Sequence, residues 1–192
     1  GRVPILITPS GKFIFETLAI INHITNRYDC FTPPKNTESH DTYWQILSLL
    51  ATTVYPAYHR QHHSKYYIVE SGYDDLRKFA RSEQAVIYDY IETLLNPYIC
   101  GELITAADFY LYMLSRWDLD KTALRKRRPK LTTFLEQIRS RPSVTKVLNN
   151  QKNTQRLTPA SWAVESQNVY STEVQLSVID RPNLLKDILD QT

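Results

Sequence analysis

The stretch from Val3 to Ile24 reads VPILITPSGKFIFETLAIINHI, and it decides the fold of this chain. Two short runs rich in β-branched and aromatic residues, 3–6 and 12–15, flank a polar turn at 8–11 that contains a glycine, which is typical of a β-hairpin. The residues that follow repeat their apolar side chains at helical spacing and predict a helix packed on that hairpin. These apolar residues are Leu18, Ile20, Ile21 and Ile24.

The start of this predicted helix carries candidate chemistry. The first N–H groups of a helix have no partner within it, and together with the positive end of the dipole they form a site for a carboxylate. Thr17 adds a hydroxyl at this point. Pro4 heads the first strand, where a missing N–H does least harm. If the Val3–Pro4 bond is cis, the backbone N–H and C=O of Val3 turn toward a peptide-like ligand.

The order of these features resembles the second half of the thioredoxin-like domain of glutathione transferases. In that family, the residue before a cis-proline pairs with the cysteinyl backbone of glutathione, and a Glu/Gln-Ser pair at the helix start holds the γ-glutamyl carboxylate. The resemblance implies that Val3, Pro4, Glu16 and Thr17 bind glutathione here, with Thr in place of Ser. The alternative is an ordinary hairpin and helix with a capped first turn.

Length and composition narrow the class of protein. The 192 residues are 42% hydrophobic, which predicts a globular chain of one or two domains, and the 13 Tyr and 3 Trp suggest a flat, apolar ligand surface. A net charge of +3 is too small to require a nucleic-acid partner. Cys30 and Cys100 form neither a disulfide framework nor a metal motif, which fits a reducing compartment, and we expect a cytoplasmic protein. No apolar run is long enough to span a membrane.

The chain begins with Gly1 rather than Met, which is compatible with a missing natural start. In glutathione transferases the thiol-activating Ser, Tyr or Cys follows the first strand of the thioredoxin-like domain. That strand has no counterpart in these residues, and no catalytic residue is assigned to this chain.

Residues 29–40 read as a polar linker, and residues 41–150 as an all-helical domain. Its first helix, from Asp41 to about residue 67, should bend near Pro56. The resemblance implies that this helix lines the second-substrate site, and the candidate wall residues are Tyr55, Tyr58, His59 and His62. Core packing and dimer contact are the alternative roles. His59 and His63 are four residues apart, but no third ligand is evident, so no metal site is predicted.

Three further patterns complete the helical region. A second long helix runs from Asp74 or Asp75 to about Leu95. Thr105 and Asp108 form a capping box at the start of an apolar, buried helix that extends to Trp117, as in the glutathione transferase helical domain. The basic run from Lys121 to Lys130 suits either an exposed loop or a nucleic-acid or membrane patch, although no aromatic residues interleave it.

The end of the chain changes composition. Residues 151–172 are polar and read as a linker, and residues 173–192 read as one strand and one helix. The segment from Val178 to Leu189 resembles the start of an ACT domain, a small amino-acid-binding regulatory module, with Asn183 where such turns usually carry Gly.

We therefore expect an α+β protein that is mostly α. It comprises a partial thioredoxin-like hairpin and helix (1–28), an all-α bundle of the glutathione transferase type (41–150) and a short βα tail (173–192). The predicted function is conjugation of glutathione, as co-substrate, to a hydrophobic electrophile, by a homodimer. The alternative is a non-catalytic relative that serves as an interaction or scaffold protein with an amino-acid-sensing tail. Nucleic-acid binding through 121–130 is a third, weaker hypothesis.

Overall fold

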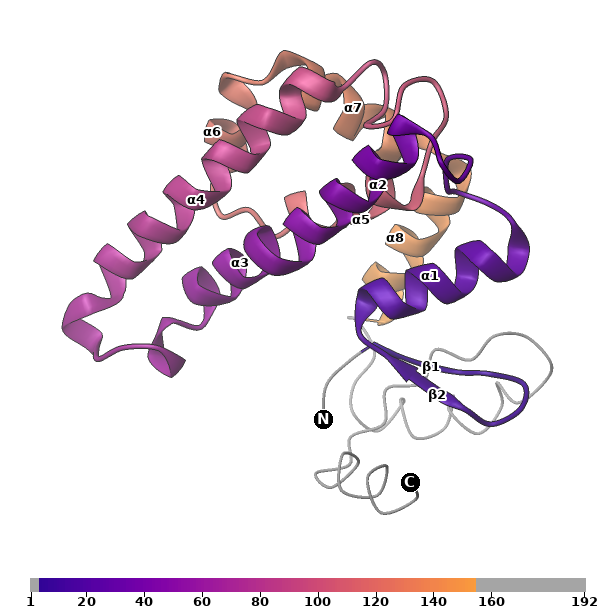
Figure 1. The fold of residues 1–192 in the computed structure, drawn as a ribbon. Coiled ribbons are helices and arrows are strands. Elements are labelled where there is room, and N and C mark those ends of the chain that lie inside the picture. Colours follow the sequence, from indigo (N-terminus) through magenta and orange to yellow (C-terminus); the bar gives the residue numbers. More distant parts are fainter. Residues whose placement is uncertain (1–3, 155–192) are drawn as a thin grey trace. The chain divides into compact units, whose positions relative to one another are not determined.

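A computed structural model describes residues 4–154, which form two compact units, 4–28 and 29–154 (Figure 1). The first unit holds a two-stranded sheet and one helix, and the second is helical. The predicted linker beyond residue 154 and the ACT-like segment at 173–192 lie outside the described residues, as does Val3. None of the helices within residues 4–154 combines the length and the apolar character that crossing a membrane requires.

In the first unit, strands β1 (Ile5–Ile7) and β2 (Phe13–Phe15) pair antiparallel, with Leu6 opposite Ile14. The turn between them closes through a hydrogen bond from the Thr8 N–H to the Lys12 carbonyl (2.9 Å). Gly11 has a φ of +83°, a left-handed conformation that glycine adopts at little cost. Helix α1 (Thr17–Tyr28) follows and buries Ile20. The hairpin and helix predicted for residues 3–24 are therefore confirmed from residue 4 onward.

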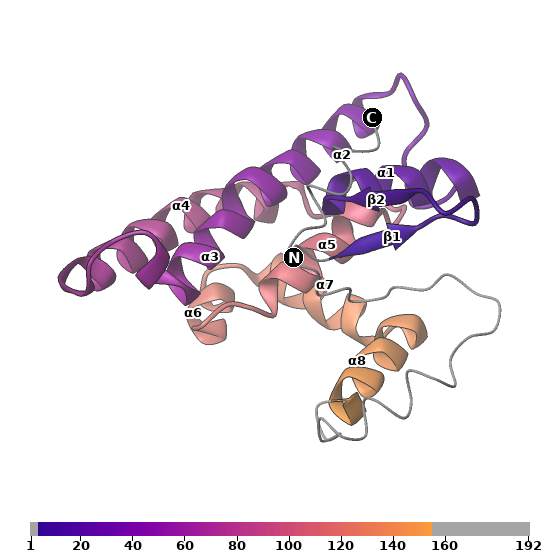
Figure 2. The same ribbon diagram turned by 90° about the horizontal axis from the view of Figure 1, so that it is seen from below.

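The second unit is built on a long pair of antiparallel helices. Helix α2 (Glu38–Leu49), a π-helical turn (Leu50–Val54) and helix α3 (Tyr55–His62) run almost continuously, and α4 (Tyr73–Leu94) returns beside α3 (Figure 1 and Figure 2). Two short 3-10 turns, Ser64–Tyr66 and Glu70–Gly72, connect α3 to α4.

The bend predicted near Pro56 takes the form of the π-helical turn. Pro56 has no N–H, and its ring would collide with the carbonyl of Thr52 in a regular α-helix. The widened turn relieves this conflict, because the N–H of Tyr55 donates to the carbonyl of Leu50, five residues back. The helix also starts three residues earlier than predicted, because Thr37 caps it by accepting the N–H of His40 (3.3 Å).

Two buried amide side chains join α3 to α4 below this turn. Gln84 donates to the carbonyl of Val54 (3.2 Å) and accepts from the Gln61 amide (2.6 Å), and both side chains are buried. Arg81 donates to the carbonyl oxygen of the Gln61 amide (3.3 Å). These bonds satisfy polar groups that water does not reach, and they fix the register of the two helices.

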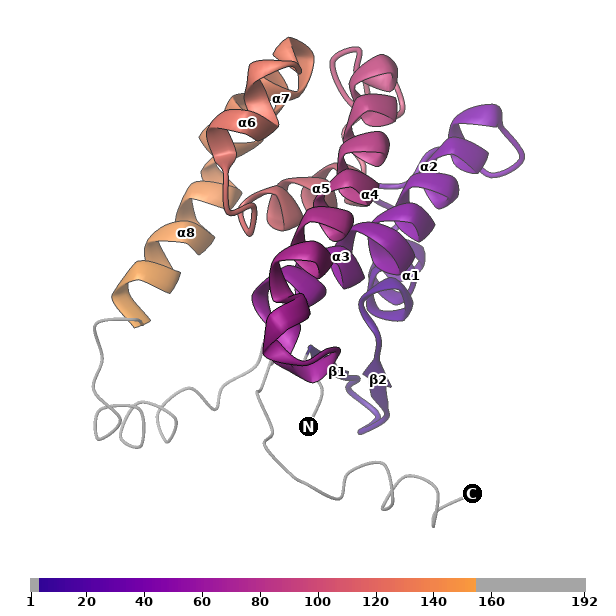
Figure 3. The same ribbon diagram turned by 90° about the vertical axis from the view of Figure 1, so that its left-hand side faces the viewer.

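Helix α5 (Ala106–Ser115) lies inside the second unit, between the α2–α4 pair and the remaining helices (Figure 3). Those helices are α6 (Lys121–Lys126), α7 (Pro129–Ser140) and α8 (Pro142–Thr154). Leu111 and Leu114 are fully buried, as the apolar pattern predicts. The prediction was wrong for Trp117, which lies two residues beyond the end of α5 and is 42% exposed.

The predicted capping box of α5 is present. The Asp108 carboxylate accepts hydrogen bonds from the Thr105 N–H (2.7 Å), the Thr105 hydroxyl (2.7 Å) and the Ile99 N–H (3.0 Å). Burial raises the pKa of Asp108 above its ordinary value, although these hydrogen bonds favour the charged form and act in the opposite direction. The box therefore ties the loop at Ile99 to the start of the buried helix.

The basic run at 121–130 is not a uniform exposed patch. Arg128 is only 5% exposed, and its guanidinium pairs with Asp89 on α4 (2.8 Å). It also donates to the carbonyl of Leu124 (2.9 Å) and lies 5.9 Å from the centre of the Tyr88 ring. This arginine holds α4 against the α6–α7 loop, so it is withdrawn from any surface that a nucleic acid would contact.

Candidate functional site

The start of α1 has the backbone geometry of a strained, specialised turn. Glu16 immediately precedes the helix with a φ of +70°, a left-handed conformation that costs a non-glycine residue on the order of 1 kcal/mol. Its carbonyl accepts the first i→i−4 bond of the helix, from the N–H of Ile20 (3.0 Å). The N–H groups of Thr17, Leu18 and Ala19 therefore precede the first regular intrahelical donor.

The predicted glutathione residues are partly described. Glu16 is exposed and Thr17 is partly exposed, next to each other at the mouth of α1. Pro4 is exposed one residue before β1. Val3 lies outside the described residues, so the isomer of the Val3–Pro4 bond stays a prediction. The arrangement at Glu16 and Thr17 can hold an anion through backbone N–H groups, the helix dipole and one hydroxyl.

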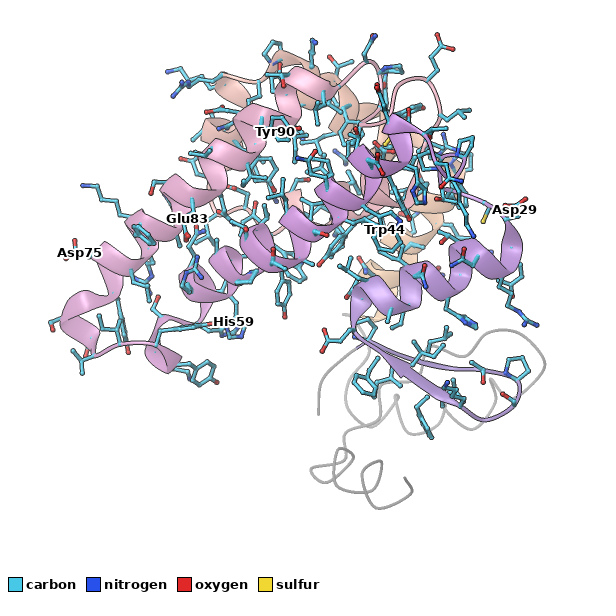
Figure 4. All side chains as sticks on the ribbon, viewed as in Figure 1. Asp29, Trp44, His59, Asp75, Glu83 and Tyr90 are labelled. Carbon is cyan, nitrogen blue, oxygen red and sulfur yellow. The ribbon has the colours of Figure 1, made fainter. Side chains whose placement is uncertain are left out.

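Three of the four predicted wall residues lie together on an exposed aromatic surface of the second unit. We call this surface the aromatic face; it comprises Tyr55, His59, His62, Tyr67 and Trp117. Tyr55 is 40% exposed, and its ring centre lies 5.8 Å from that of Trp117. A ring nitrogen of His62 is 2.9 Å from the Trp117 carbonyl oxygen. Figure 4 labels His59, which lies in the C-terminal half of α3.

Tyr58 does not share this surface, because its side chain is only 1% exposed. Its hydroxyl donates to the Asp118 carboxylate (3.0 Å) and lies 3.0 Å from the Tyr88 hydroxyl. Burial is the main reason that the pKa values of Tyr58 and Tyr88 are raised above the ordinary tyrosine value, so both phenols stay neutral. Tyr58 instead supports the aromatic face from below, through ring contact with Trp117 at 6.5 Å.

Sequence reasoning missed Trp117 and Tyr67 as members of the aromatic face. Trp117 is contributed by the loop after α5 and comes to Tyr55 across 62 positions of the sequence. Tyr67 follows α3, and its hydroxyl lies 2.7 Å from Nδ1 of His59. The sequence did indicate that Trp117 lies near the end of its helix, because the polar residues Asp118 and Asp120 follow it. Its position beside Tyr55 depends on helix packing.

His59 of the aromatic face has a second histidine, His63, as a close neighbour at the end of α3. The rings of His59 and His63 lie 4.8 Å apart. The pKa of His59 is lowered by burial and by the neighbouring His63, which favours its neutral form near pH 7. Within residues 4–154, no cluster of three or more His, Cys, Asp or Glu side chains is placed to hold a metal ion.

The two cysteines are free thiols. Burial and the nearby Asp108 carboxylate raise the pKa of Cys100 to about 12. Because the thiolate is the nucleophile and the thiol is not, Cys100 offers almost no reactive sulfur at neutral pH.

Residues 59–151 match the family model described as the glutathione S-transferase C-terminal domain. No curated protein sequence matches the chain. Among solved structures, a glutathione transferase homologue from Sulfitobacter with bound glutathione is 25% identical, with a TM-score of 0.70, covering 78% of this chain and 74% of its own. A glutathione S-transferase from Actinobacillus pleuropneumoniae is also 25% identical, with a TM-score of 0.60 and coverage of 80% and 76%.

A third structure shares the fold at lower identity. The glutathione transferase from Phanerochaete chrysosporium with oxidised glutathione is 18% identical, with a TM-score of 0.69, and covers 82% of this chain and 75% of its own. The resemblance that the order of the motifs indicated is confirmed by the matched helical domain and by these shared folds, and the chain is a glutathione transferase-like protein.

Proposed function

We propose that this protein binds glutathione at the start of α1 and conjugates it, through its thiol sulfur, to a small hydrophobic electrophile. The observation that supports the proposal is that the left-handed Glu16 directly precedes Thr17, the first residue of α1. The first N–H groups of a helix, beside a hydroxyl, favour an anion. Two structural neighbours that share the fold support this proposal. The Sulfitobacter homologue contains bound glutathione, and the Phanerochaete chrysosporium protein contains oxidised glutathione.

The γ-glutamyl carboxylate of glutathione would accept hydrogen bonds from the first N–H groups of α1 and from the Thr17 hydroxyl. The charge of this carboxylate is stabilised by the positive end of the helix dipole. Val3 and Pro4 would supply the backbone pairing with the cysteinyl unit. Val3, Pro4, Glu16 and Thr17 are thus proposed to bind glutathione, and we assign no residue to the activation of its thiol.

The electrophile would contact Tyr55, His59, His62 and Trp117 on the aromatic face. Tyr58 would hold that face in place through its bonds to Tyr88 and Asp118. In the reaction, the sulfur lone pair forms a carbon–sulfur bond while the leaving group departs with its electron pair. The thiol proton is lost to solvent or a base. Apolar rings favour a flat, neutral substrate because they remove its surface from water.

Retention on immobilised glutathione and turnover of a chlorinated nitroarene test this function together. Elution by free glutathione, with formation of the thioether in proportion to enzyme, supports transfer. Failure of the full chain to bind glutathione in a calorimetric titration would overturn the proposal. Glutathione binding without thioether formation would support the binding site but would contradict the transferase activity.

Replacing Thr17 by Val should weaken glutathione binding about tenfold, since one hydrogen bond to a charged group is lost, worth about 1.5 kcal/mol. The fold should remain intact because the side chain is partly exposed. Calorimetric titration measures the effect, and Thr17→Ser, which keeps the hydroxyl, is the matched control. An unchanged affinity in Thr17→Val would remove this residue from the site.

Replacing Trp117 by Ala should raise KM for the electrophile about tenfold, because a large apolar contact worth about 1–2 kcal/mol is lost. The dissociation constant of glutathione should not change. Tyr90→Ala is the control: Tyr90 lies on α4 (Figure 4) and is 37% exposed, similar to Tyr55, but lies outside the aromatic face. Equal effects of the two substitutions would contradict the assignment.

Assembly and location complete the proposal. We propose a homodimer, to be tested by light scattering of the purified chain, with a monomer mass as the contrary result. A reducing, cytoplasmic environment agrees with the free thiols of Cys30 and Cys100. Fractionation of cells that express the tagged protein would test the location.

A further inference from the structure

The first unit carries two adjoining hollows between β2 and α1 that take no part in the proposed glutathione site. The larger has a volume of about 800 Å³ and the smaller about 380 Å³. Lys12, Ile14, His23 and Arg27 line both, so the two hollows form one groove. We call it the β2–α1 groove. Its larger part has the volume of a typical small-molecule site.

Basic residues are concentrated where the two hollows meet. Lys12, Arg27 and His23 belong to both, whereas no Asp or Glu lines either one. Within residues 4–154, neither Lys12 nor Arg27 is paired with a carboxylate. The smaller hollow adds the hydroxyls of Thr8 and Ser10, which are hydrogen-bonded to each other at 2.9 Å. This end of the groove therefore complements a compact anion.

The other end of the groove has a different chemistry. Phe13 and Phe15, which are 38% and 41% exposed, line only the larger hollow. Asn22 and Asn26 also line it, and the Asn26 amide donates to the Asn22 carbonyl oxygen (2.8 Å). Exposed aromatic rings stack on planar ligands, and paired amides supply both donors and acceptors for the edge of a polar ring.

The helical residues that line the groove lie on a face of α1 away from Thr17. Its helical members occupy positions 19, 22, 23, 26 and 27, which share one face at 3.6 residues per turn. Thr17 is on roughly the opposite face of this helix, and Thr17 and Glu16 line neither hollow. Ligands at the mouth of α1 and in the groove would therefore contact different side chains.

We propose that the β2–α1 groove binds a nucleoside phosphate. The phosphate lies at the basic end, between Lys12 and Arg27, and the planar base lies against Phe13 and Phe15. The groove has a cationic end and a separate aromatic end, and a nucleoside phosphate would contact both. A simple anion would contact only the cationic end, and a neutral aromatic compound would contact only the aromatic end. The groove shares no residue with the aromatic face.

Calorimetric titration of the full chain with AMP, adenosine and inorganic phosphate tests the proposal. AMP should bind at least tenfold more tightly than adenosine or phosphate, because only AMP occupies both ends. Arg27→Gln and Lys12→Gln should each weaken AMP binding at least tenfold, and added salt should weaken it further. Lys35→Gln, a lysine in the second unit that lines neither hollow, is the control and should bind AMP like the unaltered chain.

Glutathione affinity separates this site from the proposed function. Arg27→Gln should leave glutathione binding unchanged, whereas Thr17→Val should leave AMP binding unchanged. No AMP binding at millimolar concentration, or equal binding by Arg27→Gln, would overturn the nucleotide site without touching the transferase. Occupation of the groove by a second copy of the chain would also overturn the nucleotide site. In that case Arg27→Gln would lower the mass measured by light scattering, whereas AMP would leave that mass unchanged.

Discussion

Replacing Asp108 by Ala should lower the free energy of unfolding by about 3–5 kcal/mol, the largest effect we expect from a single substitution. Asp108 has no exposed surface, and its carboxylate accepts from the N–H groups of Ile99 and Thr105. Removing it leaves two buried donors without an acceptor, at about 1–3 kcal/mol each, and also opens a cavity. Urea-induced unfolding followed by circular dichroism measures the loss.

Glu102→Ala provides the control for Asp108→Ala. Glu102 is an exposed acidic residue in the loop that leads to the same helix, and its loss should change stability by less than about 0.5 kcal/mol. Thr105→Ala should fall between the two, at about 1 kcal/mol, because it removes the hydroxyl while both backbone bonds remain. A loss below 1 kcal/mol for Asp108→Ala would show that the box does not hold the start of α5.

Replacing Arg128 by Ala should destabilise the protein by about 2–4 kcal/mol. The guanidinium is nearly buried, and the change removes the ion pair with Asp89 and the bond to the Leu124 carbonyl. The loss should stay below that of a fully buried ion pair, because the Asp89 side chain is 47% exposed and can be rehydrated. Thermal and urea unfolding of the purified variant give the value.

The neighbouring Arg127 supplies a control of the same residue type. It is exposed, so Arg127→Ala should leave stability within about 0.5 kcal/mol of the unaltered chain. Arg128→Lys should recover little, since an ammonium cannot reproduce the planar fork of bonds to Asp89 and two carbonyls. Equal behaviour of Arg127→Ala and Arg128→Ala would mean that the whole basic run is solvated.

This contrast bears on the nucleic-acid hypothesis for residues 121–130. A continuous basic patch needs its cations at the surface, where they replace the counterions of the phosphate backbone. Arg128 is turned inward, and Arg125 lies 3.9 Å from Glu136, so two cations of the run are engaged with the protein itself. The run is better explained as helix α6 with its connection to α7 than as an interaction surface.

Much of the fold follows from short-range signals. The glycine at position 11 and the helical repeat after Glu16 predict the hairpin and α1, and both are present. The pair Thr105 and Asp108, three residues apart, predicts the start of α5 because both partners lie on one helical turn. Pro56 also predicts a bend from a local signal, because a proline inside a helix has no N–H to donate. The π-helical form of that bend depends on which carbonyls the neighbouring N–H groups reach.

The glutathione-binding role of Glu16 and Thr17 is a prediction from the sequence, and the structure places both residues at the start of α1. The second-substrate surface was only partly accessible to sequence reasoning. Helical spacing places Tyr55, His59 and His62 on one side of α3 but also includes Tyr58, which packing against Tyr88 and Asp118 removes from the surface.

The sequence by itself determined the hairpin, the capped helices and the order of motifs that marks a glutathione transferase-like chain, because each of these depends on residues only a few positions apart. Tertiary structure alone decided that Trp117 joins Tyr55, that Arg128 is internal while Arg127 is exposed, and that Lys12 and Arg27 share a groove. The physical reason is that burial and contact depend on which helix faces meet, and the meeting partners are separated by many positions along the chain.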